Sequence, residues 1–129
     1  MKRIRVFKTK TFTRWLKKSE LTDEVLIRAV DEMRSGLIDA DLGGNVLKKR
    51  VAVSGRGKRG GARTIVATNK DDRWFFIYGF EKNVIENMGK DEENALKKIA
   101  SKLLSFSDED LLKAIVVHEM EEVAYGDEA

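Results

Sequence analysis

Hydrophobic and polar residues alternate with two different periods along the chain, and these periods separate strands from helices. Residues 2–7 and 45–53 alternate with a period of two, which predicts half-buried strands. Residues 62–68 are rich in β-branched side chains, and residues 73–80 are apolar on both faces, as in a central strand. Because short connections join the last three of these segments, they predict an antiparallel meander.

Two of the predicted strands have faces of different character. In residues 45–53 a period of two places Lys48 and Arg50 together on one face. The other face of that strand carries Leu47, Val51 and Val53. Along residues 73–80 the same period predicts one aromatic face, made of Trp74, Phe76, Tyr78 and Phe80.

Helical spacing marks the rest of the chain. A first helix carries Phe12, Trp15 and Leu16, and a second runs from a candidate N-cap at Thr22 to Gly36. Two C-terminal helices are predicted within about residues 91–123, the second opened by a capping box of Ser107 and Asp110. Their expected inward positions are Leu96, Ile99, Ala100, Leu103, Leu104, Leu111, Leu112, Ile115 and Val116.

This order of elements predicts one α+β domain over residues 1–129, with helices packed on a small antiparallel sheet in the order β-α-α-β-β-β-α-α. A hydrophobic content of 42% suits an ordinary globular core. The longest apolar run, residues 74–80, is too short to cross a bilayer, and the charged start lacks the apolar region of a signal peptide. The absence of cysteine excludes disulfides and thiolate chemistry. We therefore expect a cytoplasmic protein without a membrane partner.

Charge is distributed unevenly along the chain. Residues 42–70 contain eight Lys or Arg and no Asp or Glu, whereas residues 83–129 contain twelve acids and five bases. Two differently charged but merely solvated faces would explain this pattern. The alternative is that the basic middle segment binds a polyanion, because clustered Lys and Arg are typical of nucleic-acid binding.

The basic segment includes "SGRGKRGGARTIV" at residues 54–66, in which glycines spell G-x-G-x-x-G. A dinucleotide-binding loop requires a helix directly after the glycines, whereas here a strand is predicted. A kinase glycine loop joins two strands, but the chain is too short for a kinase and lacks its other motifs. Glycines do allow backbone N–H groups to approach a phosphate closely, so the segment suits a phosphate-bearing ligand.

Three features together resemble the RelE-like toxins of type II toxin–antitoxin modules, in particular the HigB-like branch. They are the strand order, the run "GRGKRGGAR" at residues 55–63, and "YGFEKN" at residues 78–83. The similarity extends in outline over nearly the whole chain. It implies an endoribonuclease, or mRNA interferase, that cuts mRNA on the ribosome without a cofactor. It also implies a cognate antitoxin, expected to be a helix-turn-helix protein.

The resemblance implies a set of catalytic residues as well. Lys48 and Arg50 correspond to the paired cations on the family's second strand, and Arg63 to the arginine on its third strand. Lys82 corresponds to the basic residue after the fourth strand, and Lys58 to the lysine in the glycine loop of the HigB-like branch.

RNA cleavage of this kind uses the substrate's own 2′-oxygen as nucleophile, so no metal is expected. The protein must align the reacting atoms, remove the 2′ proton and stabilise the extra negative charge. A lysine crowded by other cations loses its proton more readily, so Lys48 or Lys58 could act as the general base. Arg63 would hold the phosphate through a bidentate contact.

Further residues are expected to bind RNA rather than to react. Arg56 and Arg59 would grip the RNA backbone, and Tyr78 would present its hydroxyl at the sheet surface. His118 is remote in sequence from every cation named and is expected to lie outside the site.

Two positions depart from the family pattern. Met88 stands where many relatives have a tyrosine, and Ala62 stands where this branch commonly has an aromatic residue. Tyr78 or Trp74 could take over the stacking role. The alternative is a non-catalytic nucleic-acid-binding or regulatory protein that keeps the RelE-like fold.

Overall fold

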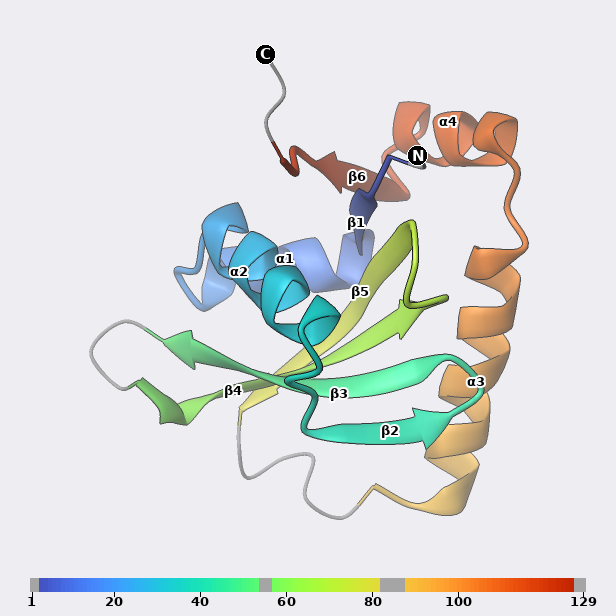
Figure 1. Ribbon diagram of the computed structural model, residues 1–129. Coiled ribbons are helices and arrows are strands. Elements are labelled where there is room, and N and C mark those ends of the chain that lie inside the picture. Colours follow the sequence, from blue (N-terminus) through green and yellow to red (C-terminus); the bar gives the residue numbers. More distant parts are fainter. Residues whose placement is uncertain (1–2, 54–56, 82–87, 127–129) are drawn as a thin grey trace.

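The computed structural model describes residues 3–53, 57–81 and 88–126, with the backbone alone for residues 53 and 57–60 (Figure 1). Within these ranges four helices pack on one sheet of six strands, which confirms the α+β class. The strands are β1 (Arg5–Thr9), β2 (Ala40–Gly43), β3 (Val46–Val53), β4 (Gly57–Thr68), β5 (Arg73–Glu81) and β6 (Met120–Val123). The helices are α1 (Lys10–Lys18), α2 (Asp23–Arg34), α3 (Lys90–Leu104) and α4 (Asp108–Val116).

The sheet has the strand order β2-β3-β4-β5-β1-β6. Strands β3, β4 and β5 form the expected antiparallel meander, while β1 pairs in parallel with β5 and antiparallel with β6. The prediction of a half-buried first strand was wrong, because β1 lies inside the sheet with Val6, Phe7 and Lys8 all buried. The short strands β2 and β6 were not predicted.

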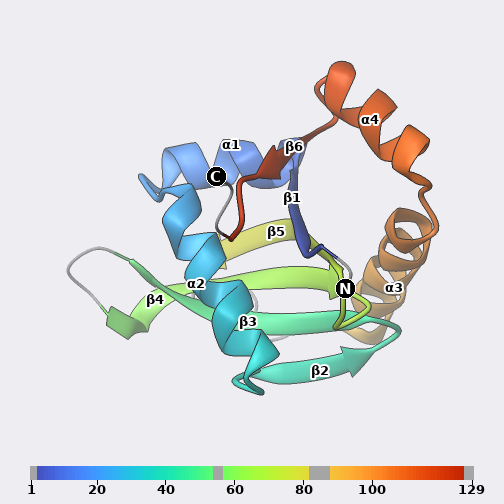
Figure 2. The same ribbon diagram turned by 45° about the horizontal axis from the view of Figure 1, so that its top comes forward.

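Helices cover both faces of the sheet (Figure 2). Helices α1 and α2 pack on one face over a core that includes Phe12, Leu26 and Trp74, and α3 and α4 pack on the other over Phe7 and Ile65. Helix α1 approaches β5 so closely at Gly79 that this position requires glycine. A Cβ atom on Gly79 would lie 2.2 Å from the ring of Trp15. Helix α1 is therefore seated directly on the end of β5.

Helix α4 is less buried than its sequence predicts. Of its expected inward residues Leu111 is buried, whereas Leu112 and Val116 are 60% and 64% exposed. The predicted capping box of Ser107 and Asp110 is present. The helix ends at Val116 rather than continuing toward residue 123, and a left-handed residue, His118 with a φ of 63°, turns the chain into β6.

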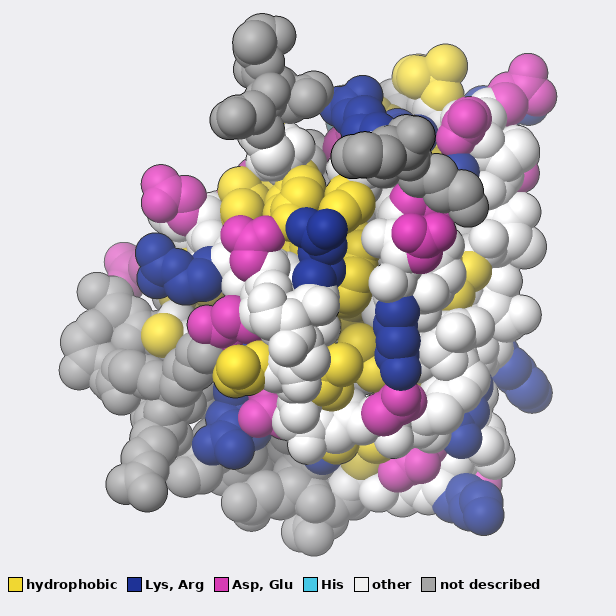
Figure 3. Space-filling model, in the orientation of Figure 1, with side chains coloured by type: hydrophobic (Ala, Val, Ile, Leu, Met, Phe, Trp, Pro, Cys, Tyr) yellow, Lys and Arg dark blue, Asp and Glu magenta, His cyan; other side chains and the backbone are white. Residues whose placement is uncertain are grey.

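One face of the molecule carries a mixture of charges. Figure 3 shows that basic and acidic side chains alternate over the side that α2 covers, around a patch of hydrophobic residues. Ion pairs contribute to this mixing, for example the Lys70 Nζ at 2.8 Å from the Asp41 carboxylate. The described side chains on the α2 side of the sheet therefore do not form a continuous basic surface.

Candidate functional site

Two adjacent strands bring three of the predicted catalytic cations onto one face of the sheet. Arg50 on β3 lies directly opposite Arg63 on β4, and Lys48 lies two residues before Arg50 on the same face. We call Lys48, Arg50 and Arg63 the cationic face. It is on the α3 side of the sheet, because Lys48 pairs with Ile65 of the core beneath α3. The predicted sharing of a face by Lys48 and Arg50 is thus confirmed.

Tyr78 reaches the same side through an irregularity in β5. The register steps from Ile65 opposite Tyr78 to Val66 opposite Phe76, so that Ile77 is an extra residue on β5. A β-bulge of this kind shifts the alternation of side chains by one position. The predicted single aromatic face is therefore wrong. The first two aromatic residues lie in the core beneath α1 and α2, whereas Tyr78 and Phe80 pack on the α3 side.

The aromatic residues Tyr78 and Phe80 border the cationic face. Phe80 lies directly opposite Arg63, and Tyr78 lies opposite Ile65, one pair further along β4. Their ring centroids are 6.0 Å apart with the planes tilted by 41°, and both side chains are partly exposed. A hydroxyl group and two aromatic surfaces thus stand beside the cations.

Arg63 has an unsatisfied donor. Its Nη1 is buried from solvent and has no hydrogen-bond partner among the residues that the structure describes. Buried polar groups normally have a partner, and each exception needs a reason. Here the nearest cross-strand neighbour is a second arginine, and like charges directly opposite each other destabilise a sheet. An anion bound between the two strands would relieve both costs.

Arg50, in contrast, already has an anionic partner that the sequence did not reveal. Its backbone N–H donates to Asp39 Oδ2 at 2.5 Å, and its Nε donates to Asp39 Oδ1 at 2.7 Å. Burial alone would raise the pKa of Asp39, but the hydrogen bonds and positive charge of Arg50 outweigh it and hold this pKa below its ordinary value. Of the two facing arginines, Arg63 therefore retains the capacity to bind an external anion.

The lowered pKa of Asp39 predicts a pH-dependent contribution to stability. A carboxylate whose pKa is lower in the folded state stabilises the fold above its unfolded pKa of about 3.9. That stabilisation is lost as the pH falls through the folded pKa. Urea unfolding should therefore show Asp39→Asn to be less stable than wild type at pH 7, with the difference shrinking below about pH 4. A difference that stays constant down to pH 3 would contradict this role of Asp39.

The two positions that depart from the family pattern have different surroundings. Met88 packs against the same hydrophobic cluster as Tyr78 and Phe80, so the residue that replaces the tyrosine does lie on the α3 side. Ala62 is fully buried in the core on the other side, facing away from the cationic face. Trp74, also considered for base stacking, is 1% exposed in that same core and is excluded from the role.

Several predicted residues cannot be placed on the cationic face. Arg56 and Lys82 lie outside the described residues, as do the side chains of Lys58 and Arg59. Lys58 and Arg59 were expected to lie in a loop. Their backbone is instead part of β4, which begins at Gly57 and pairs there with β3. His118 is exposed beside α1, so it lies outside this site, as predicted.

Fold and site together define a small α+β protein with a cationic sheet face beside two aromatic residues. The family model described as the RelE toxin of the RelE / RelB toxin–antitoxin system matches residues 4–123. The chain belongs to this family and is a toxin of a toxin–antitoxin system, which implies an antitoxin partner. A comparison with curated proteins found no match. No helix in the described ranges is long and apolar enough to span a membrane.

Proposed function

We propose that this toxin is an endoribonuclease that cleaves mRNA on the ribosome and is silenced by a helix-turn-helix antitoxin. The observation that carries the proposal is Arg63, which combines a buried, unpaired Nη1 with a second arginine directly opposite. Such an arrangement suits a ligand with at least one negative charge and several acceptor oxygens, and a phosphodiester has both. RelE family toxins are generally ribonucleases, which is consistent with this ligand.

The proposed reaction uses groups on the cationic face and on the substrate. The 2′-oxygen attacks the adjacent phosphorus as it loses its proton, the bond to the 5′-oxygen breaks, that oxygen takes up a proton from water to become a hydroxyl group, and a 2′,3′-cyclic phosphate forms. Arg63 holds the phosphate and stabilises the charge that builds up in the transition state. In this proposal Lys48, which has no hydrogen bond or ion pair with another described residue, receives the 2′ proton. Lys58 and Lys82 belong to the proposal as further cations of the site.

Tyr78 takes the place of the missing tyrosine in this proposal. It is the residue with an aromatic ring and a hydroxyl group beside the cations, and Met88 packs against the same cluster. A base of the substrate can stack on its ring, which is worth about 1–3 kcal/mol per base. Arg56 and Arg59 contact the RNA backbone in this proposal without taking part in the chemistry.

Inducible expression of the toxin alone in a bacterial host tests this function. We expect growth arrest and loss of mRNA, with cleavage ends that can be mapped on individual transcripts. With purified protein and programmed ribosomes, cleavage should persist in EDTA, with the integrity of the ribosomes checked in parallel. The product should carry a 2′,3′-cyclic phosphate or the 3′-phosphate derived from it. A 3′-hydroxyl product would disprove the mechanism, and RNA binding without cleavage would favour the non-catalytic alternative.

A further inference from the structure

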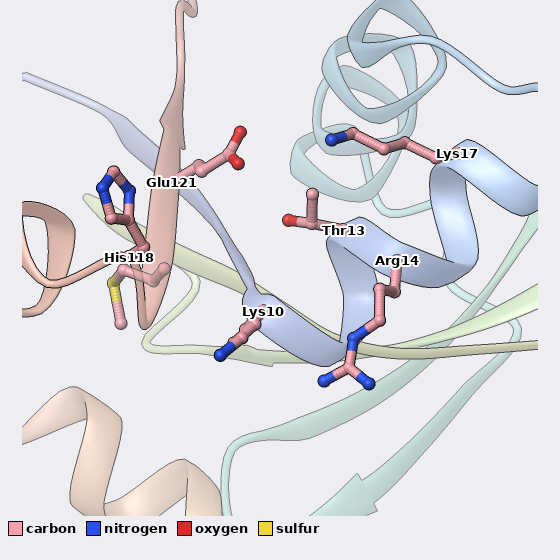
Figure 4. Close-up of a pocket in the computed structure, with 7 residues that line it drawn as sticks. Lys10, Thr13, Arg14, Lys17, His118 and Glu121 are labelled. Atoms are coloured by element: carbon pink, nitrogen blue, oxygen red, sulfur yellow. The ribbon is translucent and has the colours of Figure 1, made fainter.

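A second group of cations lies away from the cationic face, in a cleft between α1 and the turn that precedes β6 (Figure 4). The cleft has a volume of about 290 Å³. Lys10, Arg14 and Lys17 line it from α1, and His118 lines it from the turn between α4 and β6. None of these residues takes part in the proposed cleavage site.

The three α1 cations form a row along one side of the helix. Lys10, Arg14 and Lys17 are spaced at i, i+4 and i+7, which places them on the same helical face. Within the described part of the chain their side chains make no hydrogen bond or ion pair. The first turn of α1 also lacks an acidic residue that could offset them. Like charges at this spacing repel and cost the helix stability, so the row is more easily explained by an anionic ligand.

The acidic groups near the cleft do not cancel this charge. Glu121 lines the cleft, and its carboxylate lies 3.6 Å from the ammonium group of Lys8. Lys8 is 7% exposed and also pairs with Asp23 at 2.7 Å. The single ammonium group of Lys8 therefore pairs with both carboxylates. Among the described residues that line the cleft, Lys10, Arg14 and Lys17 are cations and Glu121 is a carboxylate, so the lining keeps an excess of positive charge.

The shape and composition of the cleft distinguish among anionic ligands. The row from Lys10 to Lys17 is about 10 Å long at 1.5 Å per residue. This length exceeds the diameter of a single small anion. Met120, the one hydrophobic residue in the described lining, is 3% exposed. Protein–protein interfaces are typically rich in aromatic residues and poor in lysine. A row of two lysines and one arginine, with no Phe, Tyr or Trp in the described lining of the cleft, therefore suits a nucleic-acid backbone better than an acidic peptide.

We propose that the α1–β6 cleft binds consecutive phosphates of RNA at a distance from the cleaved bond. This inference rests on the proposed function, because it supposes that the toxin meets RNA at all. The RNA has two possible sources, the mRNA strand that is cut and the ribosomal RNA that surrounds it. Both present the same phosphodiester groups, so the experiment must separate them.

A double variant that replaces two of the cations by neutral residues tests the cleft. Arg14→Gln combined with Lys17→Gln removes two unpaired charges, and glutamine has nearly the same helix propensity as arginine and lysine. The matched control is Lys98→Gln combined with Lys102→Gln, which removes two exposed charges four residues apart on α3. Both variants have the same net charge, so a difference between them reports position.

Binding is measured with three probes over roughly 50 to 200 mM salt. They are a 2′-O-methyl poly-uridine RNA, which cannot be cleaved by 2′-oxygen attack, vacant ribosomes, and poly-glutamate. On the RNA that contacts the cleft, the Arg14/Lys17 variant should bind about tenfold more weakly than the control at 50 mM salt. The slope of log affinity against log salt should be less steep for the Arg14/Lys17 variant than for the control by about 1.4. This corresponds to about 0.7 for each of two lost phosphate contacts to a single strand.

Some outcomes would identify the RNA that contacts the cleft, and others would overturn the proposal. A loss on poly-uridine assigns the cleft to the mRNA strand, and a loss confined to ribosomes assigns it to ribosomal RNA. Equal binding by both variants, a loss confined to poly-glutamate, or no RNA binding by the wild type overturns the proposal. Because none of these probes is cleaved, a failure of the proposed ribonuclease activity would appear in the cleavage assay and not here.

Discussion

Replacing Arg63 with alanine should lower the rate of RNA cleavage by roughly a hundredfold or more. The guanidinium is expected to hold the reacting phosphate most tightly when negative charge peaks in the transition state, and loss of such a contact costs about 2.7 kcal/mol. Arg63→Lys should recover only part of the rate, because an ammonium group cannot make the two-pronged contact. Single-turnover cleavage of a defined mRNA on ribosomes measures the effect.

The same substitution should leave the fold intact or make it more stable. Alanine removes one of two like charges directly opposite each other, together with a buried donor that has no partner among the described residues. The free energy of unfolding should therefore be equal to or above that of wild type while activity falls. This combination is typical of a residue that serves function at the expense of stability.

A matched control separates the role of Arg63 from a general loss of positive charge. Arg28 is an exposed arginine on α2, on the opposite side of the sheet. Arg28→Ala should keep cleavage within about twofold of wild type, since surface substitutions of this kind have small effects. Full activity in a folded Arg63→Ala variant would refute the assignment of Arg63, and equal losses in the two variants would reduce it to a bulk charge effect.

The sequence predicted the cationic face well because that prediction depends on local alternation. Lys48 and Arg50 are two residues apart on a strand, so they share a face wherever the strand pairs. The position of Arg63 opposite Arg50 was not predicted, because it depends on the register between β3 and β4; the family resemblance only implied that Arg63 belongs to the site. Residues within a regular strand can thus be assigned to faces before the fold is known.

The sequence could not predict features that depend on pairing between strands. The position of Tyr78 depends on the bulge at Ile77, and an extra residue is defined only relative to the partner strand. Asp39 becomes the partner of Arg50 only because β2 forms a hairpin with β3. The run Gly43, Gly44 and Asn45 before β3 was an available signal for that hairpin.

The polar residue between the two cations of β3 was also missed. Lys49 points to the opposite side from Lys48 and Arg50, into the core beneath α2, and its side chain is 2% exposed. Its ammonium group lies 2.8 Å from Glu32 Oε1 and donates to the carbonyl oxygen of Leu37 at 3.0 Å. A run of three cations on a strand does not reveal which of them is buried, because the burial follows from where α2 packs.

The buried pair of Lys49 and Glu32 predicts a large and asymmetric effect on stability. Glu32→Ala removes the carboxylate partner of a buried ammonium group, which typically costs about 3–5 kcal/mol in the free energy of unfolding. Lys49→Met should cost clearly less, because it removes the buried charge itself and leaves Glu32, 25% exposed, within reach of water. Urea unfolding at neutral pH measures all variants on one scale.

The double variant Glu32→Leu with Lys49→Met gives the decisive comparison. Replacing both members of a buried pair by apolar residues of similar size is often neutral or stabilising, so this variant should be more stable than Glu32→Ala. Its cleavage activity should equal that of wild type, since both residues lie on the side of the sheet away from Arg63. If Glu32→Ala unfolds within about 1 kcal/mol of wild type, the pair adds little, because exposed pairs contribute no more than that. Lys49 would then be held mainly by the carbonyl oxygen of Leu37, and the link between α2 and β3 would rest on apolar packing alone.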